Sequence, residues 1–232
     1  MTAGSLSLAD LQDSPARVLA LLDGSEVGAV EIARLPLADL PYAAFIRALL
    51  ARPGFRLDFG GRSPEAALDL VADQLIGPGT FVTERAAFAG EIARVVALLH
   101  GIAGGPPPLI ALRSYFAPGD LVWHLDRMNG AAAYRFVWPI GRPAGMAVMP
   151  ASSIDARTYA AFMRREHALL GRLDTQVAAG EGDVEQLWAH RPVQLAAMMA
   201  GRFPFVTDPD RQLVVAPGNA SIHRVDTPGR SG

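Results

Sequence analysis

A histidine and an aspartate, His124 and Asp126, stand two positions apart within a predicted strand over 121–127. Side chains two apart on a strand point to the same face. One imidazole and one carboxylate on a common face are two of the three ligands of a 2-His-1-carboxylate triad, which suits non-haem Fe(II) because it leaves coordination positions open. The third ligand must be a histidine from another strand, and His223, on a strand predicted over 220–225, is the best candidate.

The composition excludes several other chemistries. The 232 residues include no cysteine, which excludes disulfides, thiol nucleophiles and Cys-ligated metal sites. All 21 basic residues are arginine, so Schiff-base chemistry and a Walker-type phosphate loop, which need lysine, are excluded too. Neither Gly-x-Ser-x-Gly nor Ser-x-x-Lys occurs, which disfavours a serine hydrolase. A zinc hydrolase with the same ligands stays open, as does a catalytically silent metal-binding or scaffold protein.

The charge balance and the apolar runs bear on partners and location. A net charge of −2, from 21 basic and 23 acidic residues, gives no electrostatic case for binding nucleic acid or a membrane surface. Residues 1–13 lack the basic cluster and apolar run of a signal peptide. The most apolar stretch, 93–112, is interrupted by glycines and prolines, so no membrane span of about 20 residues is predicted. We expect a cytoplasmic protein that acts on a small-molecule or peptidyl substrate; its oligomeric state is open.

The order of predicted elements indicates an α+β fold. Residues 1–104 form a mostly helical region packed on the core, and the Gly/Pro run 104–108 marks the clearest boundary. Residues 105–232 carry short strands with a helical insertion at about 153–200, which favours a β-barrel or sandwich over a parallel sheet. Helices are predicted at 41–51, 64–76, 84–100, 155–179 and 183–200, and strands at 27–37, 55–59, 109–116, 121–127, 133–139 and 146–149, with a hairpin formed by 212–216 and 220–225.

Two segments resemble the Fe(II)/2-oxoglutarate-dependent oxygenases, whose core is a cupin-like double-stranded β-helix, or jelly roll. Residues 115–120, leading into the His-x-Asp pair, are similar to the first metal-binding strand of that superfamily. Residues 215–218, leading into His223 and followed by Arg230, are similar to its distal histidine and cosubstrate-binding arginine. The resemblance covers about residues 108–232, and it implies a double-stranded β-helix core with a helical N-terminal region and a helical insertion.

The resemblance also implies roles for single residues. His124, Asp126 and His223 would hold Fe(II), and 2-oxoglutarate would chelate the metal as cosubstrate. The far carboxylate of 2-oxoglutarate needs a bidentate cationic partner, which arginine supplies well. Arg230 is the first candidate, but only two residues follow it. Substitute anchors are Arg135, on the strand after the His-x-Asp strand, and Arg113, which shares a predicted strand face with Tyr115.

A looser resemblance covers the whole chain. Residues 30–36, 124–127 and 223–224 are similar to a bacterial family defined as a domain of unknown function, with a His-x-Asp-Arg motif and a C-terminal His-Arg pair. This second resemblance implies no activity.

Overall fold

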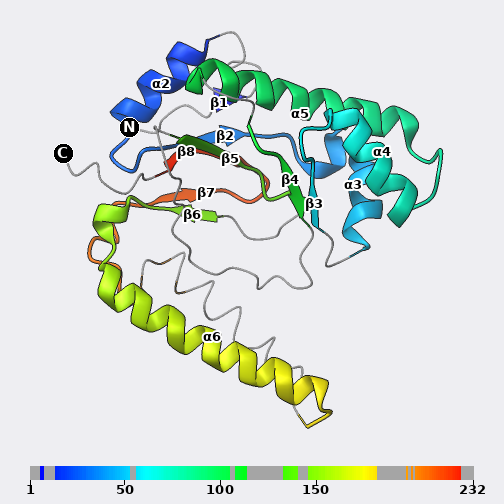
Figure 1. The fold of residues 1–232 in the computed structure, drawn as a ribbon. Coiled ribbons are helices and arrows are strands. Elements are labelled where there is room, and N and C mark those ends of the chain that lie inside the picture. The colour runs from blue at the N-terminus through cyan, green and yellow to red at the C-terminus, as the bar shows by residue number, and fades with distance from the viewer. Residues whose placement is uncertain are drawn as a thin grey trace.

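The computed structural model describes residues 6–7, 14–52, 56–104, 108–113, 133–140, 146–181, 197, 200 and 202–225. Within these residues the chain is α+β, as expected, with five α-helices and three small sheets (Figure 1). The helices are α2 (Pro15–Gly24), α3 (Ala43–Leu50), α4 (Pro64–Leu75), α5 (Val82–Ala103) and α6 (Ala156–Ala178). The strands are β1 (Leu6–Ser7), β2 (Ala29–Ala33), β3 (Arg56–Asp58), β4 (Ala111–Arg113), β5 (Ala133–Val137), β6 (Met146–Val148), β7 (Leu213–Val215) and β8 (Ala220–Val225).

The largest sheet has four strands in the order β1-β2-β8-β5. Strand β8 pairs antiparallel with both β2 and β5, while β1 is parallel to β2. One face of this sheet packs against α2 and α5, where Ile32 and Ile222 are fully buried against Val18 and Leu98. Strands from both sides of the Gly/Pro run 104–108 therefore share one sheet and one core.

The predicted hairpin at the end of the chain is wrong in its pairing. Both strands and the intervening turn form, and Asn219 N–H closes the turn on the Ala216 carbonyl at 3.1 Å. However, β7 pairs with β6, whereas β8 pairs with β2 and β5. Both edges of β8 are occupied, so no edge remains for β7. The turn at 216–219 thus carries the chain from one sheet into another.

Helix α5 runs further than predicted. An end at Gly101 was expected, but the helix continues to Ala103, and Gly104, at a φ of 61°, donates its N–H to the His100 carbonyl at 2.8 Å. Gly101 has a packing role instead, because a Cβ at this position would lie 2.7 Å from Cγ of Pro15 at the start of α2. The missing side chain lets the two helices approach each other.

Side-chain caps begin three of the described helices, α2, α4 and α6. Ser63 accepts a hydrogen bond from Ala66 N–H at 3.3 Å at the start of α4, as its position before a proline predicts. The same Ser-Pro pattern at Ser14 begins α2, a helix that the sequence analysis did not identify. At the start of α6, Asp155 caps the helix by accepting from Thr158 N–H at 2.6 Å.

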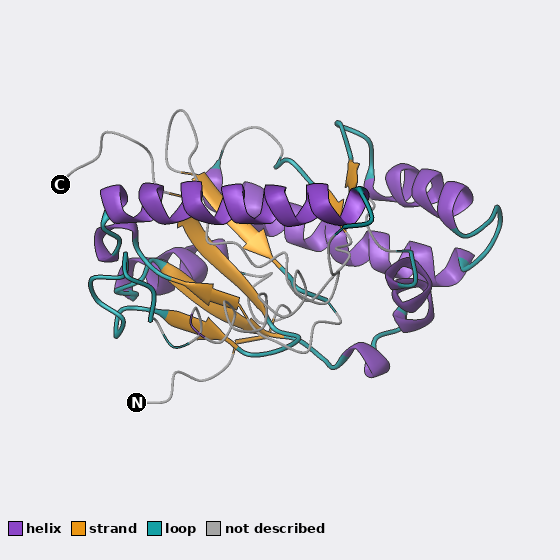
Figure 2. Cartoon of the chain, turned by 90° about the horizontal axis from the view of Figure 1, so that it is seen from below, coloured by secondary structure: helices purple, strands orange, loops and turns teal. Residues whose placement is uncertain are grey.

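Helix α6 is held by an aromatic cluster. Tyr159 and Phe162 contact Phe205 at ring-centroid distances of 5.3 and 5.0 Å, and Phe203 stacks on Phe205 at 5.2 Å. The helix lies on the far side of β6 and β7 from α5 (Figure 1). Figure 2 shows most of the strands toward one end of the molecule and the shorter helices toward the other. Strands β3 and β4 lie beside α3 and α4 (Figure 1), where Leu57 and Leu112 pack against the same core.

Among the described helices, α5 alone is long and apolar enough to cross a membrane by length and composition. This helix begins at Val82 and ends before the prolines that interrupt the stretch 93–112. In the structure α5 contacts α2, α3, α4 and β5, and it buries Arg85 and Glu91. The predicted strand 121–127 lies outside the described residues, as does nearly all of the predicted helical pair 183–200.

Candidate functional site

Strand β8 presents two chemically different faces. Ala220 and Ile222 point into the apolar core against α2 and α5. Because side chains alternate along a strand, Ser221 and His223 lie on the opposite face, the side on which Figure 1 shows β6 and β7. Both are buried, with Ser221 at 0% and His223 at 6% exposure. A buried imidazole and a buried hydroxyl therefore lie between the two sheets.

The strand register places an arginine beside the histidine. His223 is opposite Arg135 on β5 and opposite Ala29 on β2. Directly opposed residues of antiparallel strands share a face, with their Cβ atoms about 4.5–5.5 Å apart. Arg135 is exposed, whereas His223 is buried. The structure thus brings together one predicted metal ligand and one predicted cosubstrate anchor, at the border between the sheet interior and solvent.

A second contact to His223 was missed in the sequence analysis. Ser221 Oγ lies 3.3 Å from His223 Nδ1. The spacing of two positions within a predicted strand was the available signal, since it is the same spacing that relates His124 to Asp126.

Of the other predicted site residues, the structure describes only Arg113. His124, Asp126, Tyr115 and Arg230 lie outside the described residues. Arg113 ends β4, which pairs with β3 in a separate two-stranded sheet. Within the part of the chain that the structure describes, no three His, Asp or Glu side chains cluster as metal ligands would, and two members of the predicted triad fall beyond that part.

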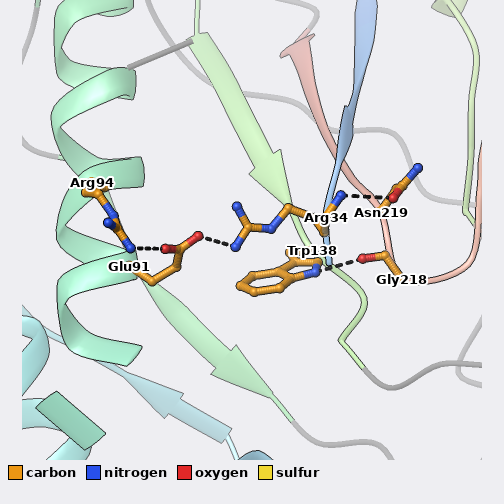
Figure 3. Close-up of polar contacts among 6 residues, drawn as sticks. All are labelled: Arg34, Glu91, Arg94, Trp138, Gly218 and Asn219. Atoms are coloured by element: carbon orange, nitrogen blue, oxygen red, sulfur yellow. Dashed lines mark hydrogen bonds and ion pairs between the residues drawn. The ribbon is translucent and has the colours of Figure 1, made fainter. Parts of the chain in front are cut away.

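The turn that precedes β8 is anchored from several elements (Figure 3). Trp138 Nε1–H donates to the Gly218 carbonyl at 3.0 Å, and Arg34 N–H donates to Asn219 Oδ1 at 3.0 Å. Glu31 Oε1 accepts from Ala216 N–H and from Asn219 Nδ2, both at 2.7 Å. These bonds fix where β8 begins, and with it the register that sets His223 opposite Arg135.

No family model, curated protein or solved structure matches this chain. The two resemblances therefore rest on the sequence motifs alone, and the functional argument rests on the site itself.

A buried ion pair supports the same turn. The guanidinium of Arg34 pairs with Glu91 on α5, and both side chains are more than nine-tenths buried. Glu91 also pairs with Arg94, whose side chain is 55% exposed. Arg34 lies over the Trp138 ring, with Cζ 4.1 Å from the ring centroid. Because these residues are distant in sequence, no local pattern predicts the network.

Tyr42 lies beside this network in the apolar core. It is 2% exposed, and its ring contacts Phe88 and Trp138 at centroid distances of 4.9 and 6.4 Å. Its hydroxyl has no hydrogen bond of ordinary geometry to any described residue. Burial raises the pKa of the Tyr42 phenol to about 12; the Glu91 carboxylate adds to the rise and the Arg34 guanidinium opposes it.

Replacing Tyr42 with phenylalanine is expected to preserve stability at neutral pH and to improve it at high pH. The variant loses a buried hydroxyl that has no hydrogen bond of ordinary geometry to any described residue. Because the pKa of the folded-state phenol is raised from 10.0 to about 12, the wild type loses stability as the pH rises from 10.0 toward 12, by up to about 2–3 kcal/mol. The variant lacks this loss. Urea unfolding of both proteins below and above pH 10.0 measures the difference, and an equal loss in both would contradict it.

Proposed function

We propose that this chain is a non-haem Fe(II) oxygenase that uses 2-oxoglutarate as cosubstrate and hydroxylates a small molecule or a peptidyl side chain. The observation that carries the proposal is the pairing of buried His223 with Arg135 across β8 and β5. An imidazole suits the iron, and a guanidinium suits the carboxylate of a dicarboxylic cosubstrate. In this function the His223 imidazole and the Arg135 guanidinium would contact the same bound assembly of iron and cosubstrate.

His223 fits the role of a metal ligand. Ligating histidines almost always bind the metal through one ring nitrogen and donate a hydrogen bond from the other. The 3.3 Å contact of Nδ1 with Ser221 Oγ suits ligation through Nε2. In the proposal, His124 and Asp126 complete the triad from the strand predicted over 121–127.

The proposed core is a cupin-like double-stranded β-helix. Such a core holds its site between two facing sheets. Two observations support it: β7 contacts β2 from the neighbouring sheet, and the turn at 216–219 carries the chain between the two sheets. The ligands and the cosubstrate would then lie between the β1-β2-β8-β5 sheet and the β6-β7 pair.

The chemistry follows from the bound groups. O₂ would be the oxidant, activated at the bound iron: one of its atoms would enter the substrate as a hydroxyl, and the other would enter succinate as 2-oxoglutarate is oxidised and loses CO₂. The chain's own residues hold and orient these groups. We assign the far carboxylate of 2-oxoglutarate to Arg135, with Arg230 and Arg113 as the other candidates, because Arg135 lies opposite His223.

Metal analysis followed by a cosubstrate assay tests the proposal. Purified full-length protein is expected to bind Fe(II) anaerobically, to give a weak visible charge-transfer band with 2-oxoglutarate, and to release succinate in air. Metal uptake without the band and without succinate would favour a catalytically silent metal-binding protein. Zinc uptake with hydrolytic activity would favour the zinc-hydrolase alternative.

Replacing Arg135 with glutamine is expected to weaken 2-oxoglutarate binding by about 10–100-fold, since a hydrogen bond to a charged group contributes about 1.5–3 kcal/mol. Fe(II) binding should not change, because Arg135 is no metal ligand in the proposal. Titration of 2-oxoglutarate into the Fe(II)-loaded protein measures the effect. Arg17→Gln, an exposed position on α2, is the matched control and should bind both as the wild type does. Equal cosubstrate affinity in the two variants would remove Arg135 from the site.

A further inference from the structure

Ser221 places a hydroxyl group in the buried interior next to the largest sheet. It is fully buried in the middle of β8, opposite Glu31 on β2 and Val137 on β5. A buried hydroxyl costs free energy unless it forms a hydrogen bond. Glu31 Oε1 accepts from Ala216 N–H and Asn219 Nδ2. Ser221 Oγ lies 3.3 Å from His223 Nδ1, and this contact gives the buried hydroxyl a hydrogen-bond partner.

We propose that Ser221 is a positioning residue that sets the tautomer of His223. Its Oγ accepts a hydrogen bond from Nδ1–H, so that Nε2 carries the lone pair. The two atoms lie 3.3 Å apart, and ligation of a metal through Nε2 requires the proton on Nδ1, which a hydroxyl oxygen can accept. Which ring nitrogen is available to a metal is set by the hydrogen bond that the other makes.

This inference deepens the proposed function, and its meaning for metal binding rests on that function. With the lone pair on Nε2, the ring is prepared for a metal before the metal arrives. The opposite arrangement, with Ser221 donating to Nδ1, would place the proton on Nε2 and oppose ligation there. The tautomer itself is a property of the protein without metal and is measurable in its absence.

The decisive experiment is imidazole ¹⁵N–¹H correlation spectroscopy of the labelled full chain at mildly alkaline pH. The chain has five histidines, and the His223 signals are assigned by their loss in His223→Gln. The wild type is expected to show His223 with its proton on Nδ1. Ser221→Ala is expected to shift the proton to Nε2, the form that an unconstrained imidazole prefers. Ser221→Thr retains a hydroxyl and should retain the wild-type tautomer.

A matched control comes from a second buried serine. Ser153 is also fully buried, and its hydroxyl has no hydrogen bond to any described residue. Ser153→Ala makes the same chemical change away from His223 and should leave the spectrum of His223 unchanged. Co(II) titration provides a second readout: Ser221→Ala should weaken binding by about 10–100-fold, as is typical for loss of an outer-shell partner, and Ser153→Ala should not.

The outcomes separate this inference from the proposed function. A wild-type His223 protonated on Nε2, or a tautomer unchanged by Ser221→Ala, would overturn the role of Ser221. The spectrum of the wild type alone shows which nitrogen of His223 carries the proton, even if a variant fails to fold. A tautomer that switches as expected in a protein that binds no Co(II) or Fe(II) would support the role of Ser221 and defeat the oxygenase proposal.

Discussion

Replacing His223 with glutamine is expected to abolish Fe(II) binding and succinate formation. Glutamine keeps the approximate size and polarity of the side chain but lacks an imidazole nitrogen to bind the metal. Loss of an outer-shell partner already costs about 10–100-fold in metal affinity, so loss of a ligand should cost more than about 100-fold. Anaerobic Fe(II) titration and a succinate assay measure the two effects, and circular dichroism reports whether the variant folds.

His100→Gln is the matched control for this experiment. His100 is exposed in the last turn of α5, where the same substitution should leave metal binding and succinate formation intact. If His223→Gln retained both properties of the wild type, the metal centre would lie elsewhere in the chain and the proposed function would lose its central observation.

Replacing Glu91 with glutamine is expected to lower the free energy of unfolding by about 3–5 kcal/mol. The substitution leaves the Arg34 guanidinium, 7% exposed, without its counter-charge, and breaking a buried ion pair from one side costs this much. The substitution should also loosen the turn before β8. The Arg34 side chain lies over Trp138, and the turn is bound by Trp138 Nε1–H and by the backbone N–H of Arg34. Urea unfolding measures the stability.

Two further variants test the physical reason. Arg94→Gln removes the exposed partner of the same carboxylate and should cost less than about 1 kcal/mol, as surface ion pairs do. Replacing both buried partners, Arg34→Met with Glu91→Leu, should recover much of the loss, since no uncompensated charge remains. Equal losses for Glu91→Gln and Arg94→Gln would show that burial does not govern this pair.

Local features of the fold were predictable where the responsible atoms are close in sequence. The Ser63-Pro64 pattern predicted the start of α4, and alternation of apolar and polar side chains predicted β3 and β5. Predictions failed where a distant residue decides the outcome. Gly101 indicated a helix end, but Pro15 of α2 packs against it. The hairpin prediction failed because β2 and β5 occupy both edges of β8.

For the site, the sequence by itself determined which chemical groups are present. Arginine is the only strongly basic side chain, thiols are absent, and two histidines lie on predicted strands. It also determined that Ser221 and His223 share a face, because alternation depends only on adjacent residues. Only the tertiary structure decided that Arg135, among 21 basic residues, lies opposite His223, and that Arg34 and Glu91 form a buried pair. The physical reason is that strand neighbours and buried partners are chosen by packing and hydrogen bonding between segments far apart in the chain, which no local pattern records.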